Sequence, residues 1–190
     1  MKGLNMLKTT LILILIAVVI VFSIFFFNYS QLQTKMNNVI KNDYRNEGIV
    51  VDVHFGNYLQ RTILEFNLKS ISSNISKADV FRILLQFSEE MVDNNFNQIY
   101  LLFKGDKKFI LSGNYFNNLG KGYSYQNSLY TMRTFPENLK NLDNQDAYPQ
   151  WTGGILGVSN KQIEDFNDFH DKWYFNDIMN IGRRTRNDKR

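Results

Sequence analysis

The longest hydrophobic run in the chain extends from Thr9 to Phe27 and reads TTLILILIAVVIVFSIFFF. Apart from the two threonines at its start, its only residue that is not apolar is Ser23. At about 1.5 Å of rise per residue, a helix over this run is roughly 28 Å long, close to the ~30 Å hydrocarbon core of a bilayer. Lipid offers the backbone no hydrogen-bond partners, so a single span must be helical. The pattern predicts a transmembrane helix over residues 9–27, preceded by a short tail over residues 1–8, with the lipid bilayer as its partner.

Other kinds of segment share part of this pattern. A cleaved signal peptide has a shorter apolar core of about 7–15 residues and small residues at its cleavage site. This run instead ends in the bulky sequence FFFNY. A buried core helix is rarely apolar on all sides over such a length. A pilin-like subunit has a similar outline, but the Phe-Thr-Leu-Ile-Glu pattern of pilins does not follow Gly3. We therefore favour an uncleaved signal anchor.

The positive charges that flank the span indicate its orientation. Lys2 and Lys8 precede it closely, whereas Lys35 and Lys41 follow it at a distance. Lysine and arginine are enriched in the cytoplasmic segments of membrane proteins. The pattern favours a bacterial-type, single-pass protein of the inner (plasma) membrane, with a short cytoplasmic N-terminus and an extracytoplasmic C-terminal domain.

The helical periodicity continues beyond the span. Leu32, Met36 and Val39 recur at the three- to four-residue spacing of one helix face. Residues 28–47 are therefore predicted as a helical stalk or linker. It leads to a globular domain over residues 48–182.

Four short segments predict strands. Residues 48–55 (GIVVDVHF) and 62–69 (TILEFNLK) alternate apolar and polar side chains, which is typical of strands with one buried face. Their succession favours an antiparallel pair. Residues 98–104 (QIYLLFK) and 107–111 (KKFIL) flank a Gly-Asp dipeptide. Because glycine accepts the positive φ of tight turns, these two segments predict a hairpin.

A helix is predicted between the two strand pairs. Ser76 can cap its first turn, and Asp79 places a carboxylate where the helix dipole favours negative charge. The apolar stripe of this helix consists of Val80, Phe81, Leu84, Leu85, Phe87, Met91 and Val92. The order β-β-α-β-β predicts an α+β fold in which one helix covers a small antiparallel sheet.

The C-terminal half is less regular until its last helix. Residues 112–156 are rich in aromatic residues and glycines, and we expect them to wrap the sheet and bury their rings. Within them, residues 130–135 (YTMRTF) are predicted as a further strand. A C-terminal helix is predicted over residues 159–175, capped by its first residue, a serine, and lost near Gly182.

The positive charge of the chain is concentrated at its C-terminal end. The formal net charge is +4, yet residues 183–190 read RRTRNDKR. Without them and the N-terminal lysines the body is slightly acidic, so no nucleic-acid partner is predicted. Residues 183–190 are predicted as a basic disordered tail. Contact with anionic lipid head groups is the alternative function for this tail.

The residue types present exclude several kinds of chemistry. The chain has no cysteine, which excludes disulfides, thiolate catalysis and cysteine-based metal sites. Its two histidines lack the carboxylate spacing of known metal motifs, and no phosphate-binding or serine-nucleophile motif is present. The acidic residues of the last helix are spread along it, whereas a hard cation needs converging oxygens. We therefore predict no metal and no cofactor.

His170 is the main candidate for catalysis. It falls on the apolar face of the last predicted helix, where Asp168 or Asp171 could orient its imidazole for acid–base chemistry. A core histidine that donates to a backbone carbonyl or a tyrosine is the simpler interpretation. Arg133, Trp151 and His170 could also meet near the turn WTGGILG, and they define the predicted ligand pocket.

These patterns favour a function in binding over one in catalysis. We expect the extracytoplasmic domain to bind another envelope protein or to belong to an envelope assembly. A membrane-anchored envelope enzyme that uses His170 with a neighbouring aspartate is the first alternative, and it needs a pocket open at His170. A sensor of a small ligand is the second, and it needs a hollow between the sheet and the wrapping segment.

Overall fold

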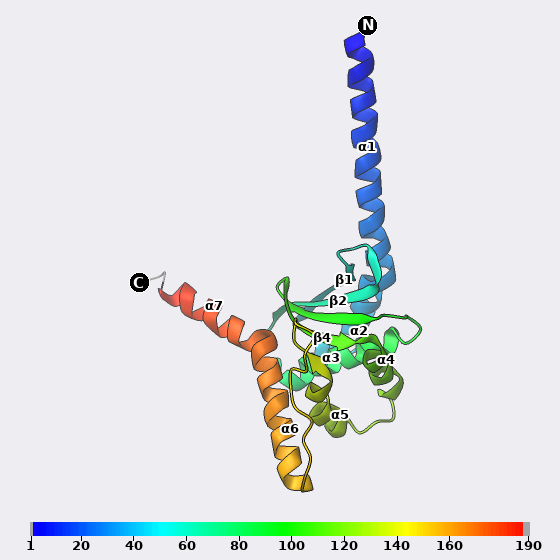
Figure 1. The fold of residues 1–190 in the computed structure, drawn as a ribbon. Helices are drawn as coiled ribbons and strands as arrows, with labels where there is room; N and C mark the ends of the chain where they lie inside the picture. The colour runs from blue at the N-terminus through cyan, green and yellow to red at the C-terminus, as the bar shows by residue number, and fades with distance from the viewer. Residues whose placement is uncertain (1, 188–190) are drawn as a thin grey trace.

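A long helix stands at one end of the molecule and an α+β domain at the other (Figure 1). The structure is a computed structural model that describes residues 2–187, with side chains described from residue 7 to residue 183. The domain contains a five-stranded, mostly antiparallel sheet and several helices. The predicted α+β class is confirmed.

One helical run leads from the apolar segment into the domain. Helix α1 (Lys2–Asn28) continues through a π-helical turn, η1 (Tyr29–Gln33), into α2 (Thr34–Asn42). The run Leu7–Asn42 is long and apolar enough to span a membrane. The apolar part of α1 projects away from the domain (Figure 1), and no residue of its most apolar window is buried. A buried core helix therefore does not describe this segment.

The helix α2 is part of the domain rather than a free stalk. Leu32 and Met36 are fully buried and belong to the same core as the sheet. Gln33 is hydrogen-bonded to the edge strand β1 (Ile49–Gly56): its Nε2 donates to the Val51 carbonyl at 3.0 Å, and its Oε1 accepts from the Val53 amide at 2.8 Å. The segment predicted as a stalk or linker is helical as far as Asn42, and it packs against the domain.

The sheet has the spatial order β1-β2-β3-β4-β5. The strands that follow β1 are β2 (Gln60–Ile71), β3 (Gln98–Phe103), β4 (Asp106–Ser112) and the two-residue β5 (Leu139–Lys140). The pair β1–β2, the pair β3–β4 and the pair β4–β5 are antiparallel, but β2 and β3 are parallel. The purely antiparallel sheet that we predicted is wrong at this one junction. A helical crossover separates β2 from β3, and such a crossover is what a parallel neighbour requires.

That crossover is α3 (Lys77–Glu90), which begins at the predicted cap. The Ser76 hydroxyl accepts from the Asp79 amide at 3.2 Å, and the Asp79 carboxylate accepts from the Ser76 amide at 2.9 Å. The apolar stripe of α3 faces the sheet, and the rings of Phe87 and Phe66 lie 6.0 Å apart. The capping box thus fixes where the helix starts, and the stripe fixes which face it buries.

The turn between β1 and β2 is fastened to the end of α1. The buried Asn28 side chain donates from Nδ2 to the Tyr58 carbonyl and accepts at Oδ1 from the Phe55 amide, both at 2.9 Å. Asn57 and Tyr58 have positive φ angles of 46° and 63°. A short 3₁₀ turn, η2 (Tyr44–Asn46), connects α2 to β1. Asn28 therefore fastens the end of α1 both to β1 and to the turn that follows β1.

The segment between β4 and the last helix is more helical than predicted. It forms α4 (Gly113–Gly122), α5 (Ser128–Thr134) and the 3₁₀ turn η3 (Pro136–Asn138). The predicted strand over residues 130–135 is wrong, because most of it lies in α5. The Asn127 side chain accepts from the amides of Leu129 and Tyr130 and caps this helix. A local cap therefore outweighs the β-propensity of the Tyr and Thr residues that follow it.

The burial of aromatic rings in this segment is confirmed only in part. Phe116, Phe135 and Tyr148 are buried in the core, whereas Tyr125 and Tyr130 are exposed.

The last helical run is longer than predicted at both ends. It consists of α6 (Ile155–His170), the π-helical turn η4 (Asp171–Phe175) and α7 (Asn176–Asn187). Gly154 is its N-cap, so Ser159 lies inside the helix and does not cap it. The helix passes Gly182, where it was expected to end, and continues to Asn187, so residues 183–187 of the predicted disordered tail are helical. Residues 188–190 of that tail lie outside the described residues.

Candidate functional site

His170 is sealed inside the core. It is fully buried among the rings of Phe166, Phe169, Trp173 and Tyr174, whose centroids lie 4.6, 4.6, 6.0 and 5.5 Å from the imidazole. Neither ring nitrogen has a hydrogen-bond partner among the described residues, so the partner expected for a core histidine is missing. Burial lowers the pKa of His170 to about 3, and the positive charge of Lys77 contributes a smaller part. The imidazole is therefore neutral near pH 7.

The neighbouring carboxylates do not orient this imidazole. Asp168 accepts from the Tyr148 hydroxyl at 2.9 Å and pairs with Lys172 at 2.6 Å. Asp171 pairs with Lys77 at 2.6 Å. A general base must reach the proton that it removes from a substrate. A sealed imidazole without a carboxylate partner does not meet that condition, so the geometry gives no support to catalysis by His170.

The residues of the predicted ligand pocket are not brought together. The Arg133 guanidinium donates from Nη1 to the Ser159 hydroxyl, near the start of α6. The Trp151 indole donates to Asp165 at 2.7 Å, further along the same helix. His170 lies in the core, further along α6 than Ser159 and Asp165. Neither Arg133, Trp151 nor His170 lines either of the two apolar hollows described below.

The second histidine belongs to an ion-pair cluster on the sheet. His54 Nε2 lies 3.7 Å from one oxygen of Glu65, and Lys107 Nζ lies 3.0 Å from the other. The Tyr58 ring stacks on His54 at 4.1 Å. Among the described residues, no group of three or more His, Asp or Glu side chains has the arrangement of a metal site. This cluster could not be predicted from spacing along the chain, because strand pairing brings His54 and Glu65 together.

The end of the domain opposite α1 carries four exposed apolar side chains on two adjacent helices. These are Leu129 (55% exposed) and Tyr130 (55%) on α5, with Ile155 (77%) and Leu156 (81%) on α6. We call these four residues the distal surface. The helices α5 and α6 are neighbours, joined by the bond between Arg133 and Ser159. Figure 1 places α5 and the start of α6 at the end of the domain opposite α1.

The distal surface combines four exposed apolar side chains on two adjacent helices. Single exposed apolar residues are ordinary on a protein surface, whereas large exposed apolar patches are typical of interaction sites. Tyr130 was among the aromatic residues that we expected to be buried, and nothing in the sequence pattern singled out the other three residues as exposed.

Comparison of the chain with protein-family models, with curated proteins and with solved structures finds no match in any of the three.

Proposed function

We propose that this chain is a single-pass membrane-anchored protein whose extracytoplasmic domain docks another envelope protein through the distal surface. The observation that carries the proposal is the exposure of Leu129, Tyr130, Ile155 and Leu156 at the end of the domain opposite the apolar helix.

The anchor explains how a small surface of this kind is effective. A tethered domain is confined near the bilayer, which raises its effective concentration toward partners in the same membrane. The partner expected from the side chains has an apolar groove or pocket, because tyrosine and branched aliphatic residues bind by filling such pockets. Ion pairs such as Lys161–Glu164, 2.6 Å apart on the exposed side of α6, supply a polar rim.

The orientation is the first part of the proposal to test. The chain has no cysteine, so single-cysteine variants can be labelled without background. A membrane-impermeant maleimide should label Leu156→Cys in intact spheroplasts, whereas Lys8→Cys should react only after lysis. The reverse pattern would place the domain in the cytoplasm. Recovery of the full chain without detergent in the supernatant of a high-speed spin would contradict anchoring itself.

Docking is tested by site-specific photo-cross-linking in intact cells. A photoreactive residue at Leu156 should form an adduct with one envelope protein, while the same residue at Asn144, an exposed turn position, should not. Adding Ile155→Asp should lower the adduct yield about tenfold or more, because a charge replaces an apolar contact at the interface. Equal yields at both positions, or adducts of the chain with itself alone, would overturn the proposal.

A further inference from the structure

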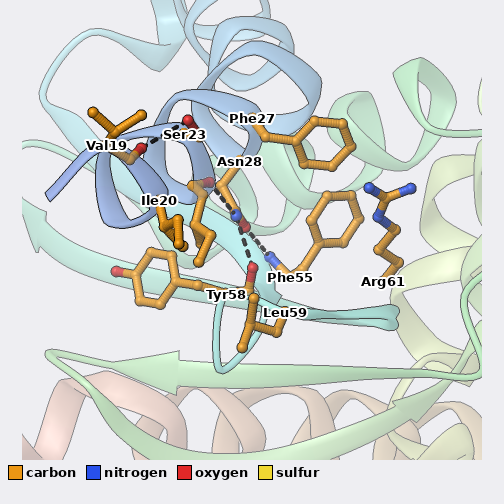
Figure 2. Close-up of a pocket in the computed structure, with 10 residues that line it drawn as sticks. Val19, Ile20, Ser23, Phe27, Asn28, Phe55, Tyr58, Leu59 and Arg61 are labelled. Atoms are coloured by element: carbon orange, nitrogen blue, oxygen red, sulfur yellow. Dashed lines mark hydrogen bonds between the residues drawn. The ribbon is translucent and has the colours of Figure 1, made fainter. Parts of the chain in front are cut away.

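An apolar groove lies where α1 meets the turn between β1 and β2 (Figure 2). Its volume is about 430 Å³, within the range of small-molecule sites. One wall is formed by Val19, Ile20 and Ile24 of α1, and the other by Phe55, Tyr58 and Leu59. A second apolar hollow of about 330 Å³ opens on the other side of Tyr58, beside Phe22 and Phe26.

The groove is at membrane depth if residues 9–27 span the bilayer. At about 1.5 Å per residue, Val19 lies roughly 13 Å along the helix from Asn28, so the wall on α1 runs well into the hydrocarbon region. Leu59 is 67% exposed and lies against this part of the helix. The turn therefore reaches into the outer leaflet beside its own anchor.

The turn is built to tolerate lipid. A polar backbone group in hydrocarbon must be paired within the protein. The amides of Tyr58 and Leu59 donate to the carbonyls of Phe55 and Gly56 at 2.7 and 3.0 Å. The Tyr58 carbonyl accepts from Asn28 (Figure 2). Asn57 and Leu59 are the exposed side chains of this turn, and the one that lines the groove, Leu59, is apolar.

A positive charge stands at the edge of the groove. The Arg61 guanidinium lies 4.4 Å from the centre of the Phe27 ring, and Figure 2 shows it beside Phe27 and Phe55. Arg61 is exposed and forms no ion pair among the described residues. A planar guanidinium suits the oxygens of a phosphate, to which it can donate two parallel hydrogen bonds.

We propose that this groove holds one phospholipid, with an acyl chain between α1 and the turn and the phosphate on Arg61. The apolar walls continue the lipid-facing surface of α1, so a lipid can enter sideways from the bilayer. A transmembrane helix of a partner is a poorer fit, because helix contacts in membranes favour small residues and these walls are bulky. Ser23 donates its hydroxyl to the Val19 carbonyl at 2.8 Å, so its proton is already used within α1.

Lipid retention tests the site directly. The full chain is reconstituted in vesicles of phosphatidylethanolamine and phosphatidylglycerol, extracted in non-ionic detergent and examined by native mass spectrometry. We expect one retained phospholipid. Arg61→Gln should lower the retained fraction about tenfold, because a charge-assisted hydrogen bond is lost. The matched control, Lys69→Gln at the other end of β2, should retain the lipid, and inorganic phosphate should not displace it.

A second variant, at a different wall of the groove, tests the same site in case Arg61→Gln changes the fold. Ile20→Trp fills the groove from α1, outside the domain, and should also abolish retention while circular dichroism stays unchanged. Equal retention by all variants would mean ordinary surface lipid and would overturn the proposal. So would cross-linking of Ile20→Cys to another protein helix in the membrane.

The depth of the turn is measured in the same vesicles. A spin label on Leu59→Cys should collide with oxygen, which dissolves in lipid, more than with a water-soluble nickel complex. The control, Tyr44→Cys, is 84% exposed in the domain and should show the opposite preference. If both labels prefer the nickel complex, the turn lies in water and the lipid site is excluded.

Discussion

Replacing Leu32 by alanine is expected to lower the free energy of unfolding by about 2–5 kcal/mol. Leu32 is fully buried although it follows the long apolar run by only a few residues, and it shares its core with Met36 and the strands. Truncation removes apolar contacts and leaves a cavity that the surrounding helix and strand fill only in part. Urea unfolding of the full chain in non-ionic detergent, followed by tryptophan fluorescence, measures the loss.

The matched control for Leu32 is the same substitution in the exposed part of α1. Leu13 is 61% exposed and touches no part of the domain core, so Leu13→Ala should leave the unfolding of the domain within about 0.5 kcal/mol of the parent chain. A similarly small effect for Leu32→Ala would mean that residues 28–47 are a linker after all. The comparison therefore decides whether the anchor and the domain share one folding unit.

Lowering the pH from 7 to 5 is expected to cost the domain about 2 kcal/mol of stability through His170 alone. The pKa of this imidazole is about 3 in the folded chain, against an ordinary value of 6.5. Between these two values the unfolded chain binds a proton that the folded chain does not. Stability is therefore present above pH 6.5 and is lost as the pH falls toward 3.

The variant His170→Leu isolates this contribution. It removes a buried polar ring whose two nitrogens have no partner, so at pH 7 the variant should be as stable as the parent chain or more stable. Other groups titrate equally in both proteins, and the difference between their unfolding free energies at pH 7 and pH 5 reports His170. Parallel curves for the two proteins would show that the imidazole is hydrated or paired in solution.

The fold could be predicted where local signals agree with one another. The apolar run, the alternation of β1 and β2, and the Ser76–Asp79 cap each act over a few residues, and each appears in the structure. The hairpin between β3 and β4 was also predicted from its glycine, and Lys104 and Gly105 of its turn have positive φ. Prediction failed where pairing is non-local. The residues of β2 and β3 do not indicate that these strands are parallel, because their relative direction depends on the crossover through α3.

The candidate sites were harder to predict for the same reason. Periodicity placed His170 on an inner face correctly, but it could not show that four rings seal it. Arg133 and Trp151 were expected in one pocket, yet each ends on a different turn of α6. Leu59 and Arg61 escaped notice because they lie in and beside a turn. Their place next to α1 depends on Asn28, 30 positions before Tyr58.

The helix runs without a break from α1 through η1 into α2, so in the proposed membrane-anchored protein the orientation of the domain follows that of the spanning helix. Because Gln33 and Asn28 both fasten this helix to β1, the domain cannot swivel freely at the surface. Membranes of different thickness tilt a spanning helix by different amounts. A change in local thickness would therefore swing the far end of the domain sideways and alter which neighbours it can reach.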